Sequence, residues 1–433
     1  MYLFAEFTVS TTFVVFACLA MLAQSIYILV GLFGPSPRYK ISLPESESVS
    51  SEQFLWNLEK ITDAKLNRCN RIEVFTNGNN FYEAELQAIS QAKKNINLEA
   101  YIFQEGEITR RFVDAFTERA RAGVTIKLTI DAAGSMSTSE NYFAALKQAG
   151  GQIAWYHPAR WYNFPNYNNR THRELMVIDG VIGFIGGAGV ADHWYKDKDA
   201  KNKRWRDTVV RVEGDVVSNL QATFAENWLN SCGELIAGPE YFPIITREEA
   251  QTAMIVNSSP SAGGSTRARI LMQSLIAAAH QSIMITTPYF LPDVSLQEEI
   301  ARARRRGVQV KIITPGKHGD HALTRSSSQH AYGRILKEGA QVFEYQPAMI
   351  HAKILIVDGV WSVVGSTNFD NRSFGLNDEV NMAVFDEHFA ARLAEDFAND
   401  VANSRAISYE EWARRPLLQR APELLGWVLE RQQ

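Results

Sequence analysis

The sequence contains few cysteines and no long basic run. Its 433 residues include only Cys18, Cys69 and Cys232, and none of these belongs to a C-x-x-C pair. That scarcity argues against a disulfide framework and against a cysteine zinc site. The net charge is −4 and the pI is about 6.2, whereas a nucleic-acid partner favours a basic protein. With 46% hydrophobic and 21% charged residues, the chain has the composition of a globular protein.

No charged residue occurs from Thr8 to Phe33. A run of this length is sufficient to cross about 30 Å of hydrocarbon. A cleaved signal peptide would need a basic start, but residues 1–7 contain Glu6 and neither Lys nor Arg. We therefore predict one retained transmembrane helix over residues 8–33. Arg38 and Lys40 follow this run and no basic residue precedes it, which predicts a single-pass protein of the inner (cytoplasmic) membrane with its body in the cytoplasm.

The rest of the chain has the pattern of a twofold repeat. Residues 34–53 are rich in Pro, Ser and Glu and are typical of a linker. Alternating strand-like and helical stretches then recur in the same order in residues 54–245 and in residues 246–433. This order predicts an α/β protein made of two pseudo-repeated α/β sandwich halves with mixed sheets, preceded by the transmembrane helix.

The second copy carries polar residues that suit a phosphate. In "IHAKILIVDG", His351 and Lys353 lie two residues apart on a predicted strand and so face the same side. Asp358 begins a glycine turn, and the following "GSTN" returns Ser366 and Asn368 beside the histidine. A lysine can neutralise a phosphate oxygen, and Ser and Asn can donate hydrogen bonds to oxygens whose charge grows in the transition state.

A second histidine in the first copy would complete such a site. An imidazole can attack phosphorus and form a covalent phosphohistidine. A second imidazole can protonate the leaving oxygen and then deprotonate the acceptor. The first copy supplies His172 in "THRELMVIDG", at the position equivalent to His351.

The pattern H-x-K-x-x-x-x-D followed by G-S-x-N resembles the phospholipase D superfamily. The stretches "TTPYFLPD", "EYQPAMIHAKILIVDG", "VGSTNFDNRSFGLNDEVN", "NRTHRELMVIDG", "GGAGVADHW" and "RWRDTVVRVEG" are similar to its bacterial cardiolipin synthase branch. The resemblance covers nearly the whole body from Phe54 onward. It implies phospholipase D-type halves and a phosphatidyl transfer that needs no metal and no cofactor.

The resemblance also implies roles for particular residues. His172 would attack phosphorus and His351 would carry the proton, with one acidic residue in each half holding the opposite imidazole. Asp207 in "WRD" and Glu379 in "LNDE" match those acidic positions. The motif aspartates, Asp179 and its counterpart Asp358, would be structural.

The activity that the resemblance implies is transfer of a phosphatidyl group to phosphatidylglycerol. Phosphatidylglycerol is the expected donor, phosphatidylethanolamine is a second candidate, and no nucleic-acid partner is expected. Two alternatives stay open: a phospholipase D that uses water as acceptor and forms phosphatidic acid, and a lipid-binding protein with a degraded site. The oligomeric state is not indicated by the sequence.

The first copy departs from the family pattern in two places. Glu174 occupies the lysine position, and the returning turn reads Gly186-Gly187-Ala188-Gly189, without the Ser and Asn. A carboxylate facing a phosphate is repulsive. We therefore expect Glu174 either to face the phosphate unpaired or to pair with Arg170, Arg173 or Arg206, and we expect Glu174→Lys to raise activity. Tyr289 is the residue expected to match Tyr101 on the equivalent strands.

Overall fold

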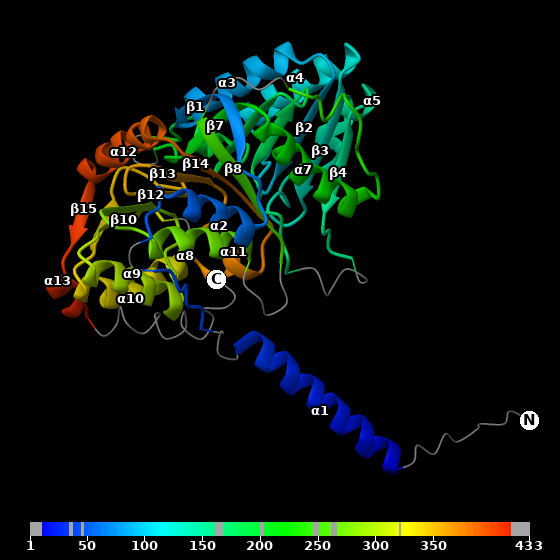
Figure 1. The fold of residues 1–433 in the computed structure, drawn as a ribbon. Coiled ribbons are helices and arrows are strands. Elements are labelled where there is room, and N and C mark those ends of the chain that lie inside the picture. Colours follow the sequence, from blue (N-terminus) through cyan, green and yellow to red (C-terminus); the bar gives the residue numbers. More distant parts are fainter. Residues whose placement is uncertain are drawn as a thin grey trace, which may run out of the picture.

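The structure is a computed structural model that describes residues 11–33, 38–44, 47–160, 168–199, 203–245, 251–260, 266–319 and 322–416. Figure 1 shows a two-lobed body, with helix α1 (Thr11–Phe33) extending away from it. Blue to green colours follow the first half of the repeat, and yellow to red colours follow most of the second.

Helix α1 covers most of the segment predicted to span a membrane. Its side chains are described from Thr11 to Tyr27, and Phe13, Phe16 and Tyr27 are among those exposed. Counting only the residues that the structure describes, none of the helices has the length and apolar character needed to cross a bilayer. The anchor over residues 8–33 therefore stays a prediction, and residues 8–10 lie outside the described part.

Fifteen strands form the sheet structure of the described chain. The strands of the first half are β1 (Asn67–Thr76), β2 (Asn95–Ala100), β3 (Thr125–Asp131), β4 (Gln152–Tyr156), β5 (Leu175–Ile178), β6 (Ile182–Gly186) and β7 (Thr208–Gly214). Those of the second half are β8 (Gln251–Ser258), β9 (Ser282–Thr286), β10 (Gln309–Pro315), β11 (Gln341–Tyr345), β12 (Ile354–Val357), β13 (Trp361–Gly365), β14 (Glu379–Phe385) and β15 (Ser404–Ile407).

The strand order confirms the predicted repeat. Read outward from the middle, the first half runs β1-β7-β6-β5-β2-β3-β4 and the second runs β8-β14-β13-β12-β9-β10-β11, with β15 added at the edge. In both halves the last three of these strands are parallel and the others antiparallel, so the sheets are mixed as predicted. The two halves also join edge to edge, because β1 pairs with β8 over three residue pairs.

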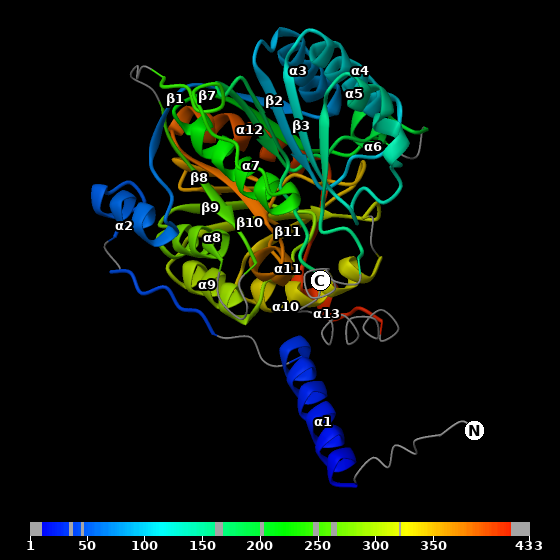
Figure 2. The ribbon, with the colours of Figure 1, turned by 90° about the vertical axis from the view of Figure 1, so that its right-hand side faces the viewer.

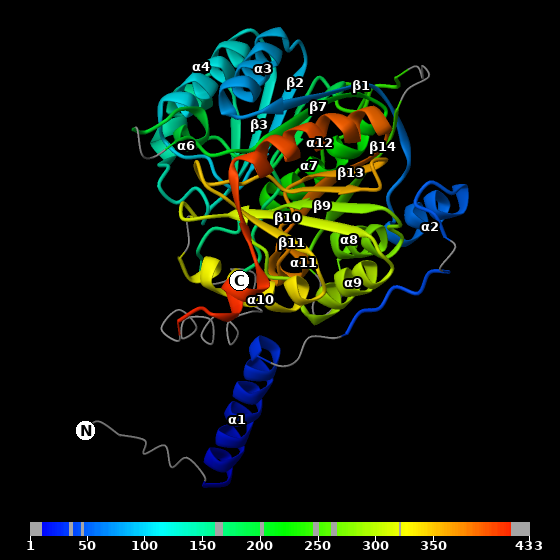
Figure 3. The same cartoon turned by 90° about the vertical axis from the view of Figure 1, so that its left-hand side faces the viewer.

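Helices cover the sheets, and two of them contribute to a core that both halves share. In Figures 2 and 3, α3 (Gly78–Gln91) and α4 (Glu107–Arg121) lie over the first half, and α8 (Arg267–Ala277) and α9 (Val294–Arg305) lie over the second. Residues of α7 (Val216–Cys232) and α12 (Glu387–Ala402) belong to one buried cluster that contains strand residues of both halves. The remaining helices are α2 (Glu52–Thr62), a 3-10 turn η1 (Glu140–Phe143), α5 (Ala144–Gln148), α6 (Asp192–Tyr195), α10 (Ala322–Lys337), α11 (Asn371–Gly375) and α13 (Tyr409–Ala413).

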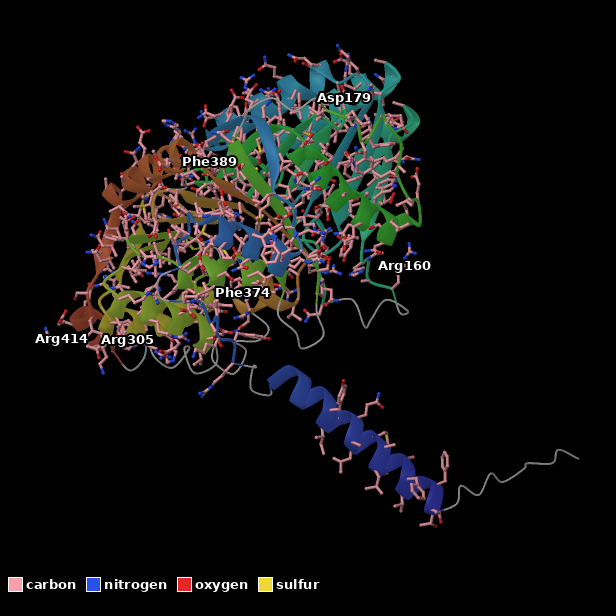
Figure 4. The ribbon with its side chains drawn as sticks, viewed as in Figure 1. Arg160, Asp179, Arg305, Phe374, Phe389 and Arg414 are labelled. Atoms are coloured by element: carbon pink, nitrogen blue, oxygen red, sulfur yellow. The ribbon has the colours of Figure 1, made fainter. Side chains whose placement is uncertain are left out.

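An Asp-Gly turn closes one hairpin in each half. Asp179 and Gly180 join β5 to β6 with φ of +55° and +68°, and Asp358 and Gly359 join β12 to β13 with φ of +52° and +68°. Positive φ at both central residues is the requirement of a tight type I′ hairpin, and Asp-Gly meets it. Each carboxylate also accepts three backbone N–H groups, from residues 93–95 and 280–282 respectively. These contacts tie each hairpin to the start of β2 or β9; Figure 4 labels Asp179 at the outer end of the first half.

Candidate active site

His172 lies just before β5 and contacts the second half of the repeat. Its Nδ1 is 3.1 Å from both carboxylate oxygens of Glu379 and 3.0 Å from the carbonyl oxygen of Ser366. Glu379, the first residue of β14, is fully buried. An Nδ1–H that donates to this carboxylate leaves Nε2 as the reactive nitrogen and favours an imidazolium when one forms.

His351 makes the reciprocal contact with the first half. Its Nδ1 lies 2.9 Å from Oδ2 of Asp207, which directly precedes β7. Asp207 also accepts the backbone N–H of Thr208 at 2.8 Å and the indole N–H of Trp194 at 3.0 Å. The rings of Trp194 and Trp205 flank the imidazole, with centroids 5.3 and 5.4 Å from its own. Each imidazole is thus oriented by a carboxylate of the opposite half.

Backbone hydrogen bonds hold this exchange in place. The N–H of His172 donates to the carbonyl of Asp378 at 2.8 Å, and the N–H of His351 donates to the carbonyl of Arg206 at 2.7 Å. In both cases the residue before the carboxylate accepts from the histidine that the carboxylate orients. The pseudo-symmetry of the two halves therefore extends to the main chain around the two histidines.

Several charges influence the pKa of Asp207. Burial acts to raise it, but the hydrogen bond and charge of His351 and the charge of Lys353 outweigh burial, so the pKa lies below its usual value. Asp207 is therefore an anion under the imidazole over a wide pH range. A permanent anion is suited to orienting a ring and stabilising its protonated form.

Lys353 crosses from the second half toward the first. Its Nζ is 2.9 Å from the carbonyl oxygen of His351 and 3.3 Å from that of Gly187, and it lies 2.8 Å from Nδ1 and 3.0 Å from Nε2 of His351. The lysine is buried with the imidazole, so a phosphate that reaches Nε2 also reaches an ammonium. A Cβ at Gly187 would lie 2.9 Å from Cδ of Lys353, which accounts for glycine where the second half has Ser366.

The two predicted hydrogen-bond donors to phosphate have different environments. The hydroxyl of Ser366 donates to Glu379 and accepts the N–H of Val380 at 3.0 Å, so it holds the carboxylate that orients His172. Asn368 is 4% exposed, and its side-chain oxygen has no hydrogen-bond partner among the described residues. Their roles toward a phosphate stay predictions.

The structure contradicts both arrangements that were expected for the Glu174 side chain. Its Oε1 accepts the backbone N–H groups of Tyr101 at 3.1 Å and Ile102 at 3.3 Å, so the carboxyl turns to the end of β2 and is not an unpaired group facing a ligand. Within the described residues no arginine pairs with it. The three candidate arginines contact other carboxylates: Arg170 with Asp131, Arg173 with Glu226 and Asp378, and Arg206 with Asp396 and Asp400.

Asp131 is a site residue that the sequence reasoning missed. It ends β3, is fully buried, and accepts the N–H of Thr171 at 3.1 Å as well as contacting Arg170. It therefore fixes the segment that leads into His172. The available signal was an acidic residue that ends the apolar run "TIKLTID", because a charge at the end of a buried strand requires partners.

Among the described residues, no three or more His, Cys, Asp or Glu side chains are grouped so that they could hold a metal ion. The side chains that surround His172 and His351 are instead carboxylates, an ammonium, indoles and backbone amides. These groups can orient a nucleophile, transfer a proton and neutralise an anionic oxygen.

Comparisons with known proteins identify one family. A family model described as cardiolipin synthase, PLD-like domain, matches residues 86–228 and 272–401. The chain is 34% identical over 363 residues to the major cardiolipin synthase ClsA of Bacillus subtilis (strain 168), a match that covers 83% of this chain and 75% of that protein. It is 33% identical over 370 residues to a cardiolipin synthase of Listeria welshimeri, covering 84% and 76%.

A solved structure supports the fold. The phosphatidylserine synthase of Haemophilus influenzae Rd KW20 superposes with a TM-score of 0.67, covering 87% of this chain and 99% of that one. The two sequences are 14% identical, so this likeness supports the shared architecture alone.

Proposed function

The chain belongs to the cardiolipin synthase family with phospholipase D-like domains, and on that premise we propose that it joins two phosphatidylglycerol molecules through a phosphohistidine. Membership makes it an enzyme of the phospholipase D-type phosphatidyltransferase class. The observation that carries the proposed mechanism is the exchange of carboxylates: Glu379 orients His172, and Asp207 orients His351.

The first step forms the covalent intermediate. Nε2 of one imidazole attacks the phosphorus of the donor, and the bond from phosphorus to the glycerol headgroup oxygen breaks. The other imidazole donates a proton to that oxygen, so glycerol leaves as the neutral alcohol. Lys353, in contact with the ring of His351, neutralises a non-bridging oxygen as charge grows on it.

The second step reverses the proton transfer. The imidazole that gave up its proton removes one from the headgroup hydroxyl of a second phosphatidylglycerol. The resulting oxygen attacks phosphorus, the bond from phosphorus to nitrogen breaks, and cardiolipin is released with both histidines restored. By the family resemblance His172 makes the attack and His351 carries the proton, an assignment that trapping of the adduct tests.

The substrate and the membrane are part of the same proposal. The lipids are phosphatidylglycerol as acceptor and as preferred donor, with phosphatidylethanolamine as a second candidate donor and nucleic acid as no partner. The body lies on the cytoplasmic side of the inner membrane, attached by residues 8–33. The uncharged run in that segment and Arg38 and Lys40 after it support this placement.

Incubation of the purified full chain with radiolabelled phosphatidylglycerol in mixed micelles tests the function. Cardiolipin and free glycerol in equal amounts are the expected products. Phosphatidic acid without cardiolipin would replace the transferase with a phospholipase D, and no turnover would indicate a lipid-binding protein with a degraded site. A parallel incubation with phosphatidylethanolamine labelled in its headgroup shows whether ethanolamine is released as well, and so whether this lipid also serves as donor.

A further inference from the structure

Glu174 makes contacts that its lysine counterpart does not make. The side chain is 7% exposed, and its Oε1 accepts the N–H groups of both Tyr101 and Ile102. These two residues follow directly on β2, where the strand leaves its pairing with β5. The carboxyl therefore satisfies two backbone donors that the ladder no longer pairs.

The equivalent position in the second half lacks one of these donors. Glu99 pairs with Leu175 in the first half, and Thr286 pairs with Ile354 in the second. Counting two residues onward from Thr286 places Pro288, and not Tyr289, at the position of Tyr101. Proline has no N–H. The half that has a proline here carries Lys353, and the half that has an N–H here carries Glu174.

Gly189 belongs to the same arrangement. A Cβ at this position would lie 3.0 Å from Oε1 of Glu174 and 2.4 Å from the carbonyl oxygen of Ile102. The second half has Asn368 at the equivalent place in its turn. The first half thus carries Glu, Tyr and Gly at the three positions where the second half carries Lys, Pro and Asn, and in the first half these three residues are neighbours in space.

Tyr101 connects the hydrogen bonds of Glu174 to the imidazole of His172. Its ring packs edge-on against the imidazole of His172, with centroids 5.1 Å apart and planes at 65°. The backbone that carries the ring is the backbone whose N–H is bound by Glu174. A shift of the Glu174 carboxyl would therefore move the Tyr101 ring that packs against the His172 imidazole.

We infer that Glu174 is a positioning residue that acts through Tyr101 on His172, and not the remnant of a phosphate-binding lysine. This inference rests on the proposed phosphatidyl transfer. Burial raises the pKa of Glu174 well above its usual value, against the opposing hydrogen bonds from Ile102 and Tyr101 and the charge of Lys353. The protonated form is favoured accordingly, and a glutamine, which keeps the carbonyl acceptor, is its closest substitute.

Steady-state cardiolipin formation by Glu174→Gln, Glu174→Leu, Glu174→Lys and Tyr101→Ala tests the inference. Glu174→Gln is expected to keep kcat within about threefold of wild type, because both N–H groups retain an acceptor. Glu174→Leu and Tyr101→Ala are each expected to lower kcat by about 30-fold with KM within about twofold, because they move His172 and not the lipid contacts. The Glu174→Leu/Tyr101→Ala double variant is expected to be no slower than the slower single variant.

Three outcomes would overturn the inference: a gain of activity in Glu174→Lys, equal losses in Glu174→Gln and Glu174→Leu, or additive losses in the double variant. Thermal midpoints are measured in parallel. If Glu174→Leu does not fold, the comparison of Glu174→Gln, Glu174→Lys and Tyr101→Ala still decides. Absence of cardiolipin formation by the wild type is a different result, since it would refute the proposed function itself and this inference with it.

Discussion

Glu379 belongs to the second half of the repeat, yet both of its carboxylate oxygens lie 3.1 Å from Nδ1 of His172 in the first half. The carboxylate is fully buried and is itself fixed by the hydroxyl of Ser366. A change that moves the carboxylate in one half therefore alters the orientation of the histidine in the other half. Asp207 and His351 form the equivalent pair, with the two halves exchanged.

Neutralising either carboxylate is expected to slow turnover strongly. In Asp207→Asn and Glu379→Gln the side chain keeps its shape but no longer fixes the tautomer or stabilises the imidazolium, and a loss of about 100-fold or more in kcat follows. Glu213→Gln, which changes a partly buried contact with Arg211 away from both histidines, is the matched control. Retention of wild-type kcat in either carboxylate variant would rule out the orienting role.

Removing either histidine is expected to abolish turnover, because the two imidazoles perform successive steps of one reaction. The kcat of His172→Ala and of His351→Ala should each be at least about 1000-fold lower than that of the wild type. Quenching the wild type in neutral denaturant during turnover should trap a phosphatidyl adduct, and peptide mapping should locate it on His172. An adduct on His351 would reverse the assignment.

Loss of activity on chelation, restored by a divalent ion, would contradict the metal-independent mechanism.

The sequence allowed prediction of how strands and helices are ordered in the two halves, but not of most side-chain contacts within each half. Repeated strand patterns predicted the mixed α/β halves, and the family resemblance indicated which carboxylate meets which imidazole. Alternation along a strand shows which face a side chain shares, but not which partner it selects, so the contacts of Ser366 with Glu379 and of Glu174 with backbone amides were not foreseen. The alignment of Tyr101 with Tyr289 was wrong by one residue, because the pairing register that fixes it is absent from the sequence.

The two turn aspartates are expected to affect stability and not chemistry. Asp179→Ala or Asp358→Ala removes the acceptor of three backbone N–H groups, which should cost on the order of 3 kcal/mol. The thermal midpoint should fall by about 3 °C while kcat of the folded fraction is kept. Asn at either position is the milder comparison, since it tolerates positive φ. A variant with an unchanged midpoint and a lost kcat would show that the aspartate acts in catalysis.

Glu99 is expected to make stability depend on pH. Its Oε1 accepts hydrogen bonds from Thr171 and Asn227, and burial, opposed by Arg173, raises its pKa to about 7. The folded protein therefore holds a proton that the unfolded chain loses near pH 4.5. The stability from this group is complete below that pH and is lost as pH rises through about 7, by up to about 3 kcal/mol.

Glu99→Gln removes this titration. The difference in thermal midpoint between pH 5 and pH 8 should be smaller in the variant than in the wild type, each measured in the same salt. Equal differences in the two proteins would show that Glu99 is already ionised across this range in the folded state.

Removal of residues 1–33 is expected to leave a folded body that no longer sediments with membranes, because the residues that follow the cut, Tyr39 and Val49 among them, contact the body and stay with it. Far-UV circular dichroism and flotation on vesicles measure the two properties. Protease added to intact spheroplasts should leave the full chain uncut. Digestion of the body under that condition would overturn the predicted orientation.

The exchange of carboxylates also constrains how this architecture can arise and diverge. A chain with one copy could build such a centre only by pairing with a second copy, since its own acidic residue points at a neighbour's histidine. Once two copies are fused, selection acts on each separately, and one can exchange a lysine for a glutamate while the other keeps the cation. The three-pair junction between β1 and β8 is the place where two such separate copies would pair edge to edge.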